Sequence, residues 1–205
     1  MALNPSTLPT RLREATKASH HAIDHHPALA PMVRSELTRD HYIDVLRAMT
    51  WIYRTLDPAL AEALRHHCPG DAYRCSERTS WLAKDLAYFH RDGPLPPPWH
   101  PPVIESAPAL VGRIYAVEGS TLGGQVIANC LAGSLRVGSN TGGRMFHGHG
   151  PSTRDRWVEF QAFAARACPH PDIETACDAA NKMFAELGRL LDQWPWGCET
   201  GRCLR

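Results

Sequence analysis

The chain has 205 residues, of which 43% are hydrophobic and 21% charged, and its net charge is +1 when histidine is neutral. This balance is typical of one globular domain with a sizeable core, and it excludes a disordered chain. A charge near zero and the lack of a long uninterrupted apolar segment argue against a nucleic-acid partner and against a membrane span.

The cysteines and the two ends of the chain indicate the compartment. The seven cysteines are an odd number, and the first residues lack the basic and apolar stretches of an export signal. We therefore expect reduced thiols in a cytoplasmic protein. A helical domain over residues 1–194 is expected to precede a tail, 195–205, in which Cys198 and Cys203 could pair or remain free.

The first predicted element is an amphipathic helix from about residue 6 to residue 24. Its inward stripe is formed by Leu8, Leu12, Ala15, Ser19 and Ile23. Successive side chains of a helix turn by about 100°, which fixes the position of every other residue relative to this stripe. One flank of the stripe carries a group of polar side chains.

This flank contains His20, with Arg13 and Lys17 beside it and Thr16 closer to the stripe, whereas His21 faces solvent. An imidazole at the edge of a core, with two cations next to it, suits an apolar ligand that carries anionic groups at its rim. A histidine that is half-buried and bonded to a neighbour is the commoner role of such a residue.

Two histidine pairs have spacings that could bind a metal. His21 and His25 are four residues apart on the outward helix face, and His147 and His149 are two apart in a predicted loop. Apart from Asp24, no nearby Cys, Asp or Glu completes a site with His21 and His25. We therefore interpret both pairs as solvent-exposed.

Two helices and a spacer are predicted next. Helical periodicity extends from Thr38, a candidate cap, to about residue 67, and Pro58 is expected to kink or break it. Ser76 is expected to cap the following helix. Six prolines between residues 93 and 102 then exclude a helix, so we expect an extended surface spacer rather than a polyproline ligand for a partner domain.

The C-terminal half is also predicted to be helical. A helix over about 107–132 is followed by a loop over 133–151, a helix capped by Ser152 or Thr153, and a last helix from Pro171 or Asp172 to near Trp194. No alternating β pattern occurs. The predicted fold class is therefore all-α, a single-domain bundle of roughly six to eight helices.

The helix over about 107–132 contains an unusual run, Gly119-Ser120-Thr121-Leu122-Gly123-Gly124-Gln125. Each interior glycine costs a helix about 1 kcal/mol relative to alanine. Gly119 and Gly123 are four residues apart, so they share one face and leave a strip of backbone without side chains. Two interpretations are open: a second helix packs closely there, or a flat ligand lies against the strip.

Two segments together resemble the haem oxygenase family. Residues 12–20, LREATKASH, are similar to the family's first helix, whose final histidine is the proximal haem-iron ligand. Residues 119–125, GSTLGGQ, are similar to the glycine-bearing distal helix. With the preceding glutamate, this form is closest to the bacterial branch associated with bacteriophytochromes. The resemblance covers most of the chain and implies a haem-oxygenase-like helical bundle.

The resemblance also implies roles for individual residues. His20 would bind the haem iron, and Arg13 and Lys17 would meet the haem propionates. Gly119 and Gly123 would bring backbone to the distal haem face. Ser120 stands where the animal branch has an aspartate, so the distal water network must be held otherwise. The other expected haem contacts are Thr16, Gly124 and Phe184.

Haem would then be both cofactor and substrate, cleaved with oxygen and external electrons to biliverdin, carbon monoxide and iron. No nucleotide-binding glycine pattern follows a strand, so a separate donor such as a ferredoxin or a flavin reductase is expected, with a bacteriophytochrome as a candidate recipient of biliverdin. Two alternatives stay open. One is a non-catalytic haem-binding or haem-transfer protein. The other is a hydrolase on the related fold, acting on thiamine-type substrates with Cys130 as nucleophile.

Overall fold

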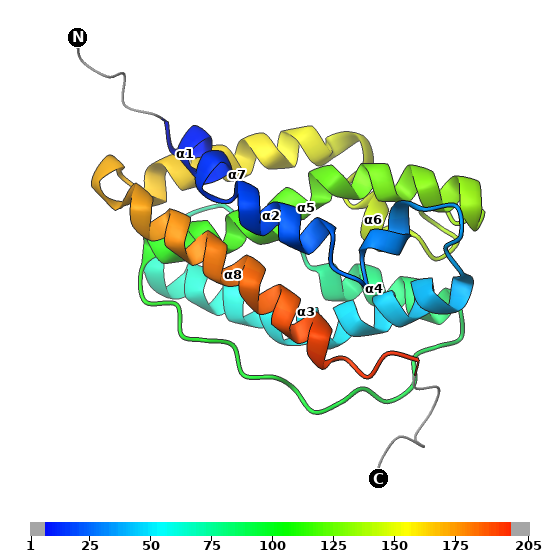
Figure 1. The fold of residues 1–205 in the computed structure, drawn as a ribbon. Coiled ribbons are helices and arrows are strands. Elements are labelled where there is room, and N and C mark those ends of the chain that lie inside the picture. Colours follow the sequence, from blue (N-terminus) through cyan, green and yellow to red (C-terminus); the bar gives the residue numbers. More distant parts are fainter. Residues whose placement is uncertain (1–6, 198–205) are drawn as a thin grey trace.

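The computed structural model describes residues 7–197, which form a helical bundle without strands (Figure 1). This confirms the predicted all-α class. The elements in chain order are α1 (Leu8–Ala15), α2 (Lys17–Asp24), η1 (Ala30–Val33), α3 (Arg39–His67), α4 (Arg78–Tyr88), α5 (Ala107–Ser134), α6 (Arg144–His147), η2 (Gly150–Ser152), α7 (Thr153–Ala167), η3 (His170–Asp172) and α8 (Ile173–Gln193), where η denotes a short 3-10 helix.

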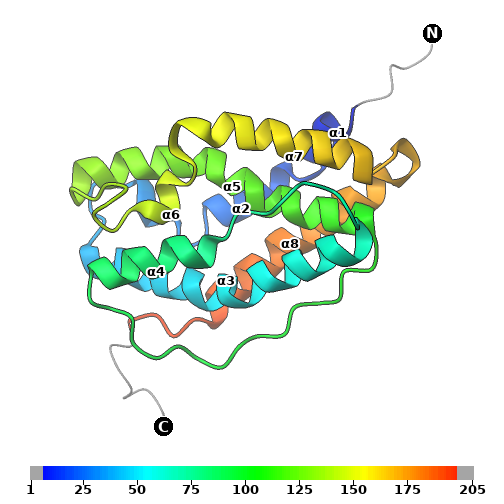
Figure 2. The ribbon, with the colours of Figure 1, turned by 180° about the vertical axis from the view of Figure 1, so that it is seen from behind.

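Helix α5 runs through the middle of the bundle. It packs against α8 and α7, and α3 and α4 lie on its other side, as the two opposite views show (Figures 1 and 2). Helices α1 and α2 pack on α8 and cross in front of α5 in Figure 1. The apolar core therefore surrounds α5, and no helix within the described residues is long and apolar enough to span a bilayer.

The predicted first helix is divided in two at Thr16. The Thr16 hydroxyl donates a hydrogen bond to the Leu12 carbonyl at 2.7 Å, and its backbone leaves the helical region (φ −99°, ψ 1°). A threonine hydroxyl that bonds the preceding turn competes with the helix hydrogen bonds and bends the chain. Periodicity alone does not reveal this break, because the apolar stripe continues across it.

Helix α3 agrees with its predicted cap and differs at Pro58. Thr38 Oγ1 accepts a hydrogen bond from the His41 amide at 3.2 Å, which confirms the cap. The helix continues through Pro58 without a break. Pro58 is exposed on the solvent side, where helices curve outward and where the loss of one hydrogen bond is repaired by water.

Ser76 does not cap α4, contrary to the prediction. The helix begins at Arg78, and its first turn is bonded by Asp57, whose Oδ2 accepts from both the Thr79 amide and the Thr79 hydroxyl at 2.7 Å. Ser76 instead turns inward and bonds Glu118. Ser76 therefore uses its hydroxyl as a hydrogen-bond donor, but to a buried carboxylate on α5 and not at the start of α4.

The proline-rich spacer lies along α3 as an extended strap. Trp51 Nε1 donates to the Pro97 carbonyl at 2.7 Å, and Arg47 donates to the Pro94 carbonyl at 2.9 Å. Trp99 Nε1 donates in return to the Ile52 carbonyl at 3.0 Å. Because proline carbonyls have no ladder to join, donors from α3 satisfy them, and the spacer role is confirmed.

The chain after α8 is held against α3. Asp44 accepts hydrogen bonds from Trp194 Nε1 at 3.1 Å and from the Gly197 amide at 2.8 Å. The beginning of the predicted tail is therefore anchored to the bundle. Cys198 and Cys203, with the rest of the predicted tail, lie outside the described residues.

Candidate functional site

A cleft of about 640 Å³ separates α1 and α2 from α5, and residues of α7 and α8 complete it. It is lined by Pro9, Thr10, Arg13, Thr16, Lys17, His20, Tyr115, Gly119, Leu122, Gly123, Trp157, Gln161 and Phe184. The structure therefore brings the predicted histidine and its two cations to the same cleft as two of the predicted glycines.

His20 stands on the α2 wall of the cleft. Its Nδ1 lies 2.8 Å from Asp24 Oδ2, one helical turn later, and its ring meets Phe184 edge-on with ring centroids 5.7 Å apart. When Nδ1–H donates a hydrogen bond to the Asp24 carboxylate, the neutral ring keeps a lone pair on Nε2. This pairing fixes the tautomer that a metal-binding imidazole needs. The i,i+4 spacing of His20 and Asp24 could have indicated it from the sequence.

Arg13 and Lys17 are cations at the cleft that have no partner among the described residues. Both side chains are exposed at the cleft, and neither makes an ion pair or hydrogen bond within residues 7–197. By contrast, Arg11 on the same helix binds Glu174 at 2.5 Å and Glu14 at 3.6 Å. Helices α1 and α2 thus each leave one positive charge at the cleft for anionic groups from elsewhere.

The glycines of α5 fall into two classes. A Cβ on Gly112 would lie 2.0 Å from the Ala176 carbonyl oxygen, and one on Gly124 would lie 2.9 Å from the Phe146 carbonyl oxygen. At Gly123 an added Cβ would meet nothing within 4 Å, and at Gly119 only the Trp157 ring at 3.9 Å. Close packing of protein therefore explains Gly112 and Gly124, whereas Gly119 and Gly123 leave bare backbone facing open space.

Gly124 therefore does not line the cleft, contrary to its predicted contact with a cofactor. It is buried against α6 because it lies about 100° around the helix from Gly123. Its neighbour Gln125 reinforces the same contact by donating to the His147 carbonyl at 2.9 Å. The sequence cannot separate these adjacent glycines without knowing where α6 packs.

Ser120 is likewise not among the residues that line the cleft. Its hydroxyl donates to the Val117 carbonyl at 2.7 Å, and the Thr121 hydroxyl donates to the Glu118 carbonyl at 2.6 Å. Burial raises the pKa of the Tyr53 phenol, and a hydrogen bond with Ser120 opposes that rise. Ser120 is thus engaged with α5 itself and with α3.

Aromatic and apolar residues of the cleft were missed in the sequence. Trp157 on α7 lies against Tyr115 with ring centroids 5.8 Å apart, and its ring edge is the nearest side chain to Gly119. Leu122 is 42% exposed and adds an apolar side chain to the lining of the cleft. Tyr115 could have been found, because it is four residues before Gly119 and shares its face. Trp157 could not be placed without the tertiary structure.

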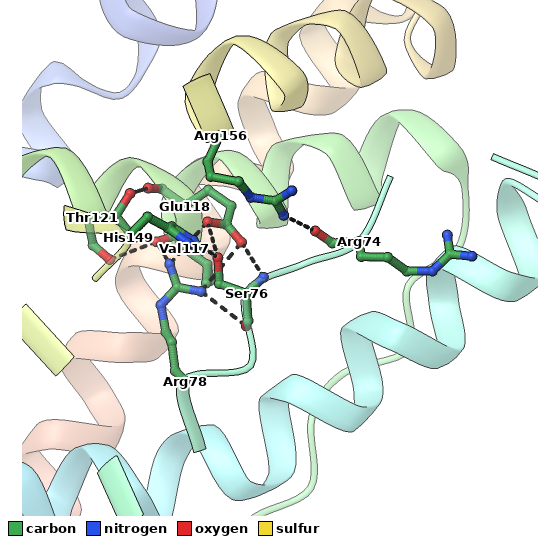
Figure 3. Close-up of polar contacts among 9 residues, drawn as sticks. Arg74, Ser76, Arg78, Val117, Glu118, Thr121, His149 and Arg156 are labelled. Carbon is green, nitrogen blue, oxygen red and sulfur yellow. Dashed lines mark hydrogen bonds and ion pairs between the residues drawn. The ribbon is translucent and has the colours of Figure 1, made fainter. Parts of the chain in front are cut away.

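A buried polar cluster lies behind the glycine segment (Figure 3). Glu118 accepts hydrogen bonds from the Ser76 amide at 2.8 Å and the Ser76 hydroxyl at 2.9 Å, and Arg78 Nη2 lies 3.4 Å from its Oε2. Burial tends to raise the pKa of Glu118, but the Arg78 charge and the Ser76 bonds outweigh it and hold the pKa below its usual value. Glu118 is therefore a buried carboxylate at neutral pH.

The histidine pairs behave differently from each other. His21 and His25 are exposed and stacked with ring centroids 4.0 Å apart, as predicted. His147 and His149 are partly buried, contrary to the prediction, and His149 Nε2 shares a 2.7 Å hydrogen bond with Ser76 Oγ. No group of three or more potential metal ligands occurs among residues 7–197.

Comparison with known proteins agrees with this arrangement. The sequence model of one family, described as Heme oxygenase, matches residues 6–94, which include α1 and α2. The matched residues make up less than half of the chain. A search of curated protein sequences finds no match to the chain.

The whole chain has the haem oxygenase fold. It is similar to heme oxygenase from Neisseria meningitidis, with a TM-score of 0.72 and 21% identity over 97% of this chain and 98% of that one. For heme oxygenase from Leptospira interrogans the TM-score is 0.71 at 17% identity, over 90% and 98% of the two chains. For heme oxygenase-1 from Synechocystis sp. PCC6803, in complex with heme, it is 0.66 at 18% identity, over 91% of each chain.

Proposed function

We propose that the protein is a haem oxygenase that binds haem in the cleft between α2 and α5 and cleaves it, with oxygen and external electrons, to biliverdin, carbon monoxide and iron. One observation carries this proposal. The backbone at Gly119 and Gly123 lines the same cleft as His20 with room for a ligand, whereas protein backbone packs directly against Gly112 and Gly124 of the same helix.

The residues present fit haem in shape and charge. The α5 wall exposes main chain at Gly119 and Gly123, and Tyr115, Trp157 and Phe184 give the cleft aromatic sides. Arg13 and Lys17 at the rim suit two propionates, and His20 suits iron. Phe184, which touches the His20 ring, would restrict how that ring rotates.

Bound haem would supply the iron at which oxygen is activated. His20 would hold that iron through Nε2, and Asp24 on Nδ1 would make the imidazole a better donor. Among the described residues that line the cleft, none is a carboxylate. The α5 wall would then offer main chain and space to the bound oxygen, without a strong acid that could draw the chemistry away from the porphyrin edge.

The sequence also supports proposals about the electron donor, the recipient of the product and the cellular location. We propose a separate electron donor, a ferredoxin or a flavin reductase, because the sequence has no nucleotide-binding glycine pattern after a strand. The Glu-Gly-Ser-Thr-Leu-Gly-Gly form supports a bacteriophytochrome as the recipient of biliverdin, and the five described cysteines, all unpaired, are consistent with the proposed cytoplasmic location. The thiamine-hydrolase alternative has less support, since the Cys130 thiol has no hydrogen-bond partner within residues 7–197.

An optical assay tests the function. Purified protein is mixed with hemin, a reductant is added in air, and the spectrum is followed. We expect the haem band to decay while a biliverdin band grows. A haem spectrum that forms and then persists would favour a haem-binding or haem-transfer protein, and failure to form a haem complex would refute the proposed cleft.

A further inference from the structure

The buried cluster behind the glycine segment is placed where it can control the position of that segment. Arg78 is 0% exposed and Glu118 is 5% exposed, so the pair is removed from solvent. Figure 3 shows Ser76, Arg78 and His149 converging on Glu118, which directly precedes Gly119 in α5. A charged pair so close to the cleft wall, yet outside the cleft, has no role in binding the ligand directly.

Arg78 contacts the helix backbone as well as Glu118. Its Nη2 donates to the Val117 carbonyl at 2.8 Å, and the same carbonyl accepts the Ser120 hydroxyl at 2.7 Å. A carbonyl that accepts two side-chain donors is drawn away from its own helix hydrogen bond, which bends the helix locally. Arg78 therefore acts on the turn of α5 immediately before Gly119.

The Arg78 guanidinium is itself held in place. It lies over the Tyr53 ring at 5.4 Å and over the Trp81 ring at 6.0 Å, so aromatic side chains from α3 and α4 fix its plane. Ser76 binds both oxygens of Glu118 from the segment before α4. Contacts from α3 and α4 thus converge on Arg78 and continue through its hydrogen bond to the Val117 carbonyl, two residues before Gly119.

We propose that Arg78 and Glu118 are positioning residues that set the path of α5 at Val117–Gly119 and thereby select which edge of the porphyrin is cleaved. The inference rests on the proposed function, because it assigns the choice of biliverdin isomer to that same cleft. Ser76 supports the pair by orienting the Glu118 carboxylate. None of the three touches the cleft, so their effect passes entirely through the backbone of α5.

The test separates positioning from stability. Glu118→Gln leaves Arg78 buried without a counter-charge, so it can fail to fold for that reason alone. The double variant Arg78→Met/Glu118→Leu removes both charges and keeps similar volume, which a buried pair generally tolerates. Its matched control is Arg166→Met/Asp71→Leu, which removes a more exposed ion pair of 3.0 Å between α7 and the segment after α3.

Two measurements are made on the double variant and its control. In the haem-free protein, amide exchange over residues 117–124 should be accelerated about tenfold or more, with α3 unchanged. With hemin, reductant and air, the ratio of biliverdin isomers should shift by about threefold or more from that of the unmodified protein, because small displacements redirect reactivity. The control should match the unmodified protein in both.

Unchanged amide exchange over residues 117–124 would overturn the proposal, and so would faster exchange accompanied by the original isomer ratio. If the unmodified protein leaves haem intact, the proposed function fails, whereas the exchange measurement still decides whether the pair positions α5. The two failures are therefore distinguishable.

Discussion

Gly123 and Gly124 are neighbours in α5, yet the structure predicts opposite outcomes when each is replaced by alanine. At Gly123 the added methyl group meets open space, and the helix gains about 0.5–1 kcal/mol from the better helix former. At Gly124 the methyl group would lie 2.9 Å from the Phe146 carbonyl oxygen, so α5 and α6 must separate. Such overpacking costs about 1–3 kcal/mol.

Urea denaturation of the haem-free protein measures both free energies of unfolding. We expect Gly123→Ala to be as stable as the unmodified protein or more stable, and Gly124→Ala to be destabilised. If Gly123→Ala lost as much stability as Gly124→Ala, the cleft beside Gly123 would have to be filled in solution, and the reasoning from bare backbone would be refuted.

A larger side chain at the same position tests the ligand. Gly123→Leu should weaken haem binding at least tenfold, or about 1.4 kcal/mol, because the leucine occupies the space proposed for haem. Gly133→Leu is the matched control, since Gly133 lies on the same helix, also meets nothing within 4 Å, and does not line the cleft. Equal haem affinity of the two variants in an optical titration would contradict the proposed site.

Three further predictions concern the histidine, the rim and pH. His20→Ala should alter the haem-iron spectrum and His21→Ala should not; identical spectra would reject His20 as the ligand. Arg13→Ala should weaken haem binding by about 0.5–1 kcal/mol per exposed contact, whereas Arg11→Ala, which removes the contact with Glu174, should leave haem affinity unchanged in the same titration. Burial raises the pKa of Asp85 from 3.8 to about 6, so the native state binds the proton more tightly than the unfolded state does. The contribution of Asp85 to the unfolding free energy should therefore fall as pH rises from about 4 to 6, by at most about 3 kcal/mol, and Asp85→Asn should remove this contribution from the pH dependence in denaturation curves; an unchanged slope would contradict the assignment.

Periodicity and residue type were sufficient to predict where most of the long helices lie, and which residues share the helix faces that line the site. The position of His20 on the flank of the first helix follows from the helical repeat, as does the shared face of Gly119 and Gly123. These features depend on residues within about two turns of one another, and local geometry is enough to relate them. The cleft that joins them is a tertiary feature, and only the family resemblance pointed to it before the structure did.

The errors share a physical cause, which is competition from distant partners. Ser76 has the residue type of a helix cap, but the buried Glu118 carboxylate on α5 is its partner instead. Gly124 belongs to the glycine run, but Phe146 from α6 covers it. His149 looks solvent-exposed in a loop, yet it shares a hydrogen bond with Ser76. In each case a contact over 20 or more residues decides the environment, and no local pattern encodes it.

The most direct test of the proposed haem site is a crystal structure of the protein with hemin bound. We predict iron coordinated by His20 Nε2, propionates beside Arg13 and Lys17, and the main chain of Gly119 and Gly123 against the opposite porphyrin face. Haem bound outside this cleft, or iron coordinated by another side chain with the cleft still open, would contradict it.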